Sequence, residues 1–174
     1  MFFTGAGNVT RTRNTESIEE GLEMNTELEK FKGFTGYQPG QIITGRLPRN
    51  QDLLKSMTEL VQDAEIESGF IKVLGAVRNA RLGYFNQKTT DYEYLDFNHP
   101  LEIIHCGGNI SLLNGEPMIH AHIVLGDQQG QAYGGHLAEG TEIYVAEVVL
   151  QEFIGDPQVR LEDPESGLSL WSTS

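Results

Sequence analysis

Apolar residues recur at the helical period in one stretch of the chain. The positions follow the spacing i, i+1, i+4, i+7, i+8 and i+11, which places them on one face of a helix. They are Leu53, Leu54, Met57, Leu60, Val61 and Ala64. The pattern predicts a long amphipathic helix with Asn50 as its N-cap and Gly69 as its stop signal.

The rest of the apolar pattern favours strands. Runs that are apolar or that alternate with polar residues are separated by turn residues such as Asn114-Gly115. They cover residues 41–47, 70–77, 81–86, 92–97, 101–105, 109–113, 118–125, 131–137 and 143–152. Arg78-Asn79 is typical of a turn, and Gly107-Gly108 interrupts a further run. We expect an α+β fold: a mainly antiparallel sheet of about seven strands, with the long helix and short helices packed on it.

The length of 174 residues suits a single domain. Residues 1–36 are polar and only weakly periodic, which indicates an N-terminal extension. Residues 37–174 are expected to form the domain, with its core in 38–152. The last segment is polar and rich in turn residues. Its apolar members, Leu161, Leu168, Leu170 and Trp171, predict that it docks back on the domain.

The charge balance limits the choice of partner. The formal net charge is −13, and affinity for nucleic acid comes largely from Lys and Arg on phosphate, so DNA is a disfavoured though possible partner. The single cysteine, Cys106, excludes an intrachain disulfide and a thiol-rich metal cluster. No run approaches the roughly 18 apolar residues of a membrane span, and the first residues do not resemble a signal peptide. We expect no membrane contact and a cytoplasmic location.

The candidate chemistry is concentrated in Ile119-His120-Ala121-His122-Ile123. Alternate residues of a strand share a face, so His120 and His122 point the same way while Ala121 points to the core. Two imidazoles so placed can hold one divalent ion. The competing interpretation is a pair of ordinary polar residues, which is the commoner meaning of an isolated His-x-His.

His136, after Gly134-Gly135, is the natural third ligand on the next strand. A two-residue turn at Gln128-Gln129 would set His136 against Ala121 and turn it to the wrong face. A three-residue loop would correct this, as would a bulge at the two glycines or a site closed between subunits. Three imidazoles suit zinc, although copper, nickel or iron remain open.

Other side chains near this strand are weaker candidates. Glu102 and Cys106 share parity on a nearby strand, whereas His105 is expected on the other face. Cys106 is more simply a buried, inert thiol. His99, beside Pro100, is expected in a loop. The sequence contains no phosphate-binding loop, dinucleotide fingerprint or nucleophile elbow. A cupin also carries His-x-His on a strand, but its following glutamate is missing here.

Several segments, in order, resemble the PPC (plants and prokaryotes conserved) domain family over about residues 38–152. They are Thr44-Gly45-Arg46-Leu47, Pro100-Leu101-Glu102-Ile103-Ile104, Gly108-Asn109-Ile110-Ser111, Gly115-Glu116-Pro117, His120-Ala121-His122, Gly134-Gly135-His136-Leu137 with Gly140, and Glu147. The resemblance implies an antiparallel sheet with packed helices, a homotrimer, and a metal, zinc first, on His120, His122 and His136. It also implies the label of a DNA-binding protein, although the chain lacks the Arg-Gly-Arg-Pro core of an AT-hook.

Four functions follow as hypotheses. The first is a trimeric metal-binding module with a regulatory or ligand-binding role. The second is a zinc-dependent hydrolase or lyase with Glu102 as base. The third is a DNA-associated regulator, which requires Arg46, Arg49, Arg78 and Arg81 to gather on one face. In the fourth, the histidines only pack at a subunit interface.

Overall fold

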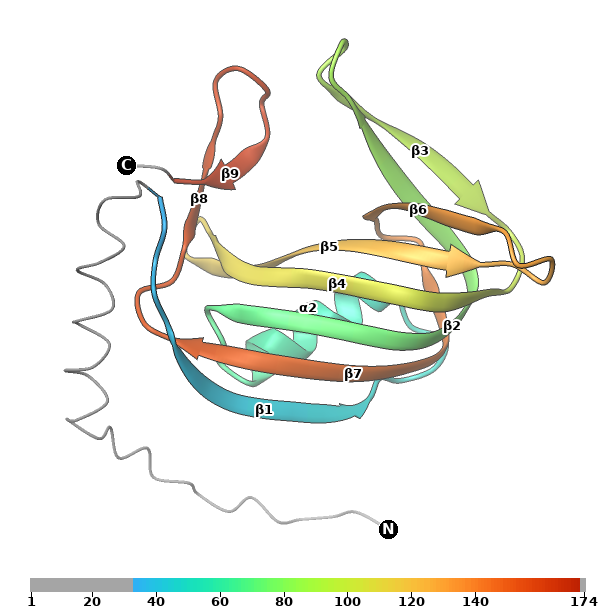
Figure 1. Ribbon diagram of the computed structural model, residues 1–174, viewed down its shortest axis with the longest axis horizontal. Coiled ribbons are helices and arrows are strands. Elements are labelled where there is room, and N and C mark those ends of the chain that lie inside the picture. Colours follow the sequence, from blue (N-terminus) through green and yellow to red (C-terminus); the bar gives the residue numbers. More distant parts are fainter. Residues whose placement is uncertain (1–32, 173–174) are drawn as a thin grey trace.

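The computed structural model describes residues 33–172, so most of the predicted N-terminal extension lies outside the described residues. The described part is mostly sheet with one helix (Figure 1). Its elements are β1 (Gln38–Arg46), α2 (Leu53–Asp63), β2 (Gly69–Asn86), β3 (Asp91–Phe97), β4 (Leu101–Leu113), β5 (Glu116–Gly126), β6 (Ala132–Leu137), β7 (Glu142–Ile154), β8 (Val159–Glu162) and β9 (Ser169–Trp171). No helix in this part is long and apolar enough to cross a lipid bilayer.

The nine strands form one sheet in the order β1-β7-β2-β6-β5-β4-β8-β9, with β3 paired to β2. All pairings are antiparallel except that between β4 and β8. β2 also pairs with β4, so β2, β4, β5 and β6 close a circuit in which each strand bonds to two others. This closure places β6 between β5 and β2, where it carries one part of the site described below.

The helix is shorter than the sequence pattern predicts. It has 11 residues, and its N-cap is Asp52, whose side chain accepts a hydrogen bond from the Lys55 amide at 3.0 Å. Asn50 lies before the cap with a φ of 61°, so the prediction of an Asn50 cap is wrong. The helix ends at Asp63 because Glu65, at φ 52°, takes the left-handed conformation and reverses the chain. The predicted stop, Gly69, instead begins β2.

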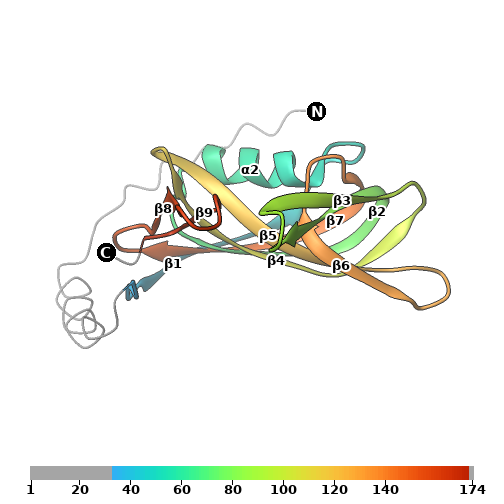
Figure 2. The same ribbon diagram turned by 90° about the horizontal axis from the view of Figure 1, so that it is seen from above.

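α2 lies along one face of the sheet, as Figure 2 shows. Its side chains Leu53, Met57 and Val61 are fully buried, and they join the inward-facing residues of the strands in one hydrophobic core. Burial of such side chains is the main stabilising term of a domain this size. The predicted additional short helices do not occur in residues 33–172.

Two predicted breaks in the strands are wrong. Arg78-Asn79 is not a turn: β2 continues through it and changes partners, from β4 and β7 before it to β3 and β6 after it. Gly107-Gly108 lies inside β4. A Cβ at Gly108 would collide with the His120 carbonyl oxygen and with Ala121, so this glycine permits close approach of β5 and does not interrupt the strand.

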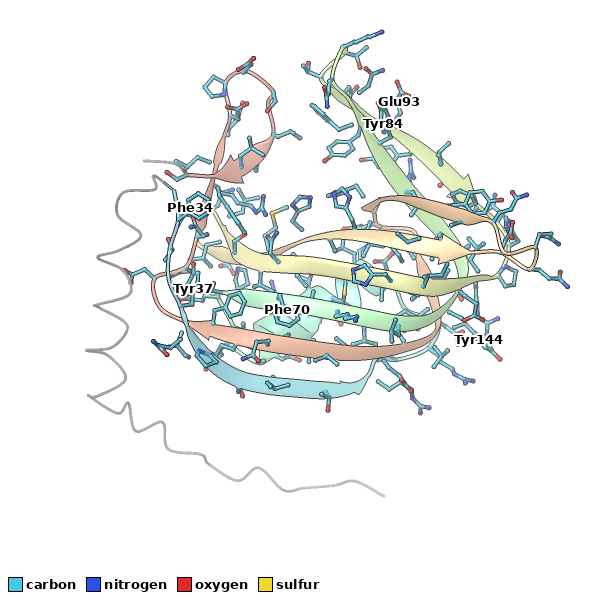
Figure 3. All side chains as sticks on the ribbon, in the orientation of Figure 1. Phe34, Tyr37, Phe70, Tyr84, Glu93 and Tyr144 are labelled. Carbon is cyan, nitrogen blue, oxygen red and sulfur yellow. The ribbon has the colours of Figure 1, made fainter. Side chains whose placement is uncertain are left out.

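Among residues 33–172, no helix or second sheet covers the face of the sheet opposite α2. The registers place Phe70 across from Asn109 and from Gln151, and directly opposed residues share a face. Figure 3 shows Phe70 in front of the sheet in the view in which α2 lies behind it. We call this side, which carries Phe70, the open face. Its partly exposed apolar side chains are Ile42, Phe70, Leu74, Ile104, Val124 and Val149.

The C-terminal segment returns to the sheet through β8, which runs parallel to β4. The β8–β9 hairpin and the β2–β3 hairpin both project beyond the main sheet (Figure 1). The sequence predicted that this segment docks through its apolar side chains. In the structure, however, Leu161, Leu170 and Trp171 are exposed. The buried residue of this segment is Arg160.

Candidate metal site

The register between β5 and β6 decides where His136 points. In the structure His122 lies opposite His136, and Gly126 lies opposite Ala132. The Asp127 amide donates to the Gln131 carbonyl at 3.0 Å, which leaves a three-residue loop, 128–130. This is the longer loop that the sequence left as one option, and it turns His136 to the same face as His122.

His120, His122 and His136 form a tight cluster within one chain, which we call the histidine cluster. Each offers a ring nitrogen, and these three nitrogens lie within 4.8 Å of one another. The ring centroids are 5.2 Å apart for His120 and His122, 5.1 Å for His120 and His136, and 5.5 Å for His122 and His136. No carboxylate or thiol among residues 33–172 joins the group.

A glycine on β2 makes room for the cluster. Gly83 of β2 pairs with His136, and a Cβ there would lie 3.4 Å from the His136 Cβ and 3.1 Å from the Tyr92 ring. Tyr92 itself lies against His136, with ring centroids 5.2 Å apart. The missing side chain of Gly83 therefore leaves space for the Tyr92 ring and His136 to pack together.

The environment keeps the imidazoles of His120 and His136 neutral. Burial lowers the pKa of His120 to about 4, assisted by the positive charge of Arg160 and by His136 and His122. Burial, then His122 and Arg160, also lowers the pKa of His136. Both rings are therefore neutral at pH 7, and the neutral ring is the form that offers a lone pair to a metal.

The cluster fits a transition metal chemically. The Nδ1 atom of His136 is buried and has no hydrogen-bond partner, which is a costly state for a polar atom unless another ligand satisfies it. Nitrogen ligands at ~2.0–2.1 Å from a tetrahedral zinc are roughly 3.4 Å apart. Binding would draw the three rings closer by about an ångström. Three ligands leave a fourth position open.

Residues 34–154 match the sequence model of the Plants and Prokaryotes Conserved (PCC) domain, also abbreviated PPC. The chain belongs to this family. The resemblance expected from the ordered motifs is thereby confirmed.

Solved structures of PPC-like proteins agree. A PPC protein from Pyrococcus horikoshii is 34% identical, with a TM-score of 0.76, over 80% of this chain and 96% of that one. A metal-containing protein from Archaeoglobus fulgidus is 33% identical, with a TM-score of 0.75, over 79% and 96%. A protein from Bacteroides thetaiotaomicron, described as a candidate DNA-binding protein, is 26% identical, with a TM-score of 0.71, over 79% and 97%.

Two curated relatives are much longer proteins. Both are named bifunctional protein GlmU, from two strains of Synechococcus. They are 29% identical over 149 residues and 31% identical over 127 residues, covering 76% and 70% of this chain. The match spans only 23% and 18% of their lengths, so the chain corresponds to one portion of those relatives.

The structure does not bring the weaker candidates of this PPC domain into the cluster. A bulge between Ile103 and His105 inserts one residue, so the predicted shared parity of Glu102 and Cys106 is wrong. Cys106 points into the core, where burial raises the pKa of its thiol to about 12, while Glu102 is exposed. His105 lies opposite Val124, on the face of the cluster and not on the other face as expected. His99 lies in the loop 98–100, against Phe97.

Glu102 is too far along the strand to act on a metal at the cluster. It lies opposite Gly126, four residues from His122 on β5, which is roughly 13 Å at the rise of a strand. It lines a separate pocket of about 320 Å³ with Arg78 and Tyr144 among its other walls.

Sequence reasoning missed Arg160. Its Nη2 atom lies 3.4 Å from the Nδ1 atom of His120, and only 6% of the residue is exposed. One signal was available: Arg160 is the only lysine or arginine after Lys88, in a stretch rich in Asp and Glu. The parallel pairing of β8 with β4, which brings it to the cluster, has no local sequence signal.

Proposed function

We propose that this chain is a cytoplasmic, homotrimeric metal-binding protein of the PPC family. His120, His122 and His136 would hold one transition-metal ion, with zinc as the first choice, and the site would serve ligand binding or regulation.

One observation carries the metal assignment. Three ring nitrogens from two adjacent strands converge within 4.8 Å, and one nitrogen of His136, the buried Nδ1, has no hydrogen-bond partner among residues 33–172. The cluster brings polar ring nitrogens of three partly or fully exposed histidines together without a carboxylate or thiol among residues 33–172. A shared cation would satisfy these nitrogens. The metal-containing relative from Archaeoglobus fulgidus supports the same choice.

Zinc suits an all-imidazole set with an open position, and copper, nickel and iron accept the same ligands. Calcium and magnesium prefer oxygen ligands, which the cluster lacks among residues 33–172. The open position makes the ion accessible to a small ligand.

A zinc-dependent hydrolase or lyase is the weaker alternative. Such an enzyme needs a base close to the metal-bound water, within hydrogen-bond reach or one water away. Glu102, the base that the sequence suggested, lies on β4 opposite the last residue of β5, and no described carboxylate joins the cluster. The geometry therefore favours binding over hydrolysis.

A DNA-associated role has support from the description of the Bacteroides relative but little from the surface. Arg49 and Arg78 both lie over the Tyr144 ring, each 5.1 Å from its centroid. Arg78 also pairs with Glu142 at 3.3 Å, and Arg81 pairs with Asp96 at 3.7 Å. Acidic partners reduce the positive field that phosphate binding requires, and the net charge of −13 reduces it further.

The homotrimer has support from the open face. Apolar side chains from five strands remain partly exposed there, including Leu74 at 47% and Ile104 at 54%. A contiguous apolar patch on a sheet without a covering layer is typical of a protein–protein interface. Other copies of this chain would cover that face.

Metal content per chain tests the metal assignment. Untagged protein should carry about one transition-metal ion per chain by mass spectrometry, and the His120→Ala/His122→Ala variant should carry almost none. His99→Ala, which removes a histidine from the distant loop, should retain the metal of the wild type.

The assignment fails if folded wild-type protein is free of metal and also takes up no added zinc. The fourth hypothesis, histidines that only pack at a subunit interface, would then stand.

A further inference from the structure

Arg160 is a buried arginine without a carboxylate partner. Only 6% of the residue is exposed, and no Asp or Glu among residues 33–172 lies within ion-pair distance of it. A buried charge is costly unless another charge compensates it. The charge of the guanidinium therefore requires a compensating anion. Residues 33–172 of the chain do not provide one.

The neutral neighbours of Arg160 hold its side chain in place. Nε donates to the Ser111 hydroxyl, Nη1 to the Ser169 carbonyl and Nη2 to Asn109 Oδ1, each at 2.8 Å. The guanidinium also lies 5.7 Å from the centroid of the Trp171 ring. These contacts fix the orientation of the guanidinium but do not neutralise its positive charge. Three of the five N–H donors of the arginine bond to these groups and a fourth faces the His120 ring, so one donor remains for a ligand.

The fixed guanidinium lies directly beside the histidine cluster. Asn109, which holds Nη2, is opposite His120 in the β4–β5 pairing, and Nη2 itself is 3.4 Å from the His120 ring. A divalent ion on three neutral imidazoles would therefore lie close to a second positive charge. Two positive charges at short range in a partly buried site repel each other strongly. An anion between the two positive charges would attract both of them and would replace the repulsion by a net attraction.

We propose that the histidine cluster and Arg160 together bind a small oxyanion, a carboxylate or a phosphate. One oxygen would occupy the open position of the metal and another would accept from the guanidinium, whose fork suits oxyanions. This inference rests on the proposed metal site and names the class of ligand that the site would recognise.

Linkage between the two ligands gives a test. Cobalt(II) replaces zinc and reports on its ligands by visible absorption. In wild type, acetate should shift the cobalt spectrum with saturation, and it should tighten metal binding. Acetamide, the neutral isostere of acetate, should do neither. Phosphate added in place of acetate shows which kind of oxyanion the site prefers.

Arg160→Gln separates a role in the site from a role in the fold. Without the positive charge, cobalt should bind more tightly in the absence of anions, whereas acetate should bind at least tenfold more weakly. Arg160→Lys, which keeps the charge and loses the fork, should be intermediate for acetate. Arg49→Gln, a surface control over Tyr144, should match wild type. If Arg160 only anchors the β8–β9 hairpin, Arg160→Gln would lower the melting temperature but would not change the metal and acetate affinities in this pattern.

The outcomes distinguish the two proposals. Normal cobalt uptake by wild type without any response to acetate or phosphate overturns the oxyanion site and leaves the metal site intact. An equal response to acetamide, or equal acetate affinity in Arg160→Gln, overturns it as well. Wild type that takes up no cobalt overturns the metal site, and the oxyanion site with it. Because the acetate and acetamide comparison uses wild-type protein, the test does not depend on the folding of a variant.

Discussion

Asp127 sets the loop on which the histidine cluster depends. Its Oδ1 accepts from the Gln129 and Gln131 amides at 2.9 and 2.8 Å, and its Oδ2 accepts from the Tyr133 hydroxyl at 2.9 Å. These bonds hold the three-residue loop that places His136 opposite His122. One carboxylate outside the site thus fixes the strand register within it.

Asp127→Ala should lower the melting temperature at pH 7 and weaken metal binding. Hydrogen bonds, first from the Gln131 amide, hold the pKa of Asp127 below its ordinary value. A carboxylate with a depressed pKa stabilises the fold above the unfolded value of about 4, and this contribution is lost as the pH falls through the folded value. Thermal melts should therefore show a smaller difference between variant and wild type at acid pH. A difference that does not change with pH would show that the carboxylate charge is not the cause.

At the scale of elements, α2 is fastened to the sheet through its first turn. Asp52 caps the helix at the Lys55 amide and also accepts from the Gly140 amide at 2.6 Å, in the loop between β6 and β7. One side chain therefore satisfies a helix end and ties it to the strand connection that follows His136.

Asp52→Ala should cost about 1–2 kcal/mol of unfolding free energy, the upper part of the range for an N-cap, because a second bond is lost with the first. Asn50→Gly is the matched comparison. Asn50 has a φ of 61°, which glycine adopts freely, so this change should stay within ~0.5 kcal/mol. Denaturant unfolding of both variants measures the difference. An equal loss of unfolding free energy in Asp52→Ala and Asn50→Gly would mean that Asp52 does not act as the cap.

The elements show where sequence patterns succeed and where they do not. Period and alternation predicted the α2 face, most strands and the common face of His120 and His122, because each depends on neighbouring residues. The continuity of β2 and β4 was missed because it depends on the partner strands: β2 passes Arg78 with a register shift against β7, and Gly108 lies within β4 against the backbone of β5. The register of β6 was left open, because it depends on which backbone amides Asp127 binds.

At the scale of the whole molecule, the site combines segments that are distant in the sequence. The family motifs predicted three of its members, His120, His122 and His136. Arg160 was missed because it arrives on β8 through a parallel pairing, and its contacts with Asn109 and Ser111 link residues about fifty positions apart. The net charge of −13 was informative at this scale, since two of the four arginines suggested for DNA, Arg78 and Arg81, pair with Glu142 and Asp96.

The open face relates the proposed site to the proposed assembly. Across the sheet, Asn109 lies opposite both His120 and Phe70, so the histidine cluster and the apolar patch share this face. The three histidines nevertheless come from a single chain. Assembly and metal binding should therefore be separable, with the patch needed for the first and the cluster for the second.

Leu74→Asp tests this separation. Leu74 lies on the open face at 47% exposure, so the substitution leaves the core intact but places a charge where copies would meet. Wild type should have the mass of three chains by light scattering, and Leu74→Asp should have the mass of one, still with about one metal per chain. Leu170→Asp is the matched control, since Leu170 is similarly exposed, at 44%, but lies on β9. A wild-type protein with the mass of one chain would contradict the trimer. A Leu74→Asp variant that still has the mass of three chains would place the interface elsewhere. A folded, monomeric Leu74→Asp variant without metal would show that the metal site depends on assembly.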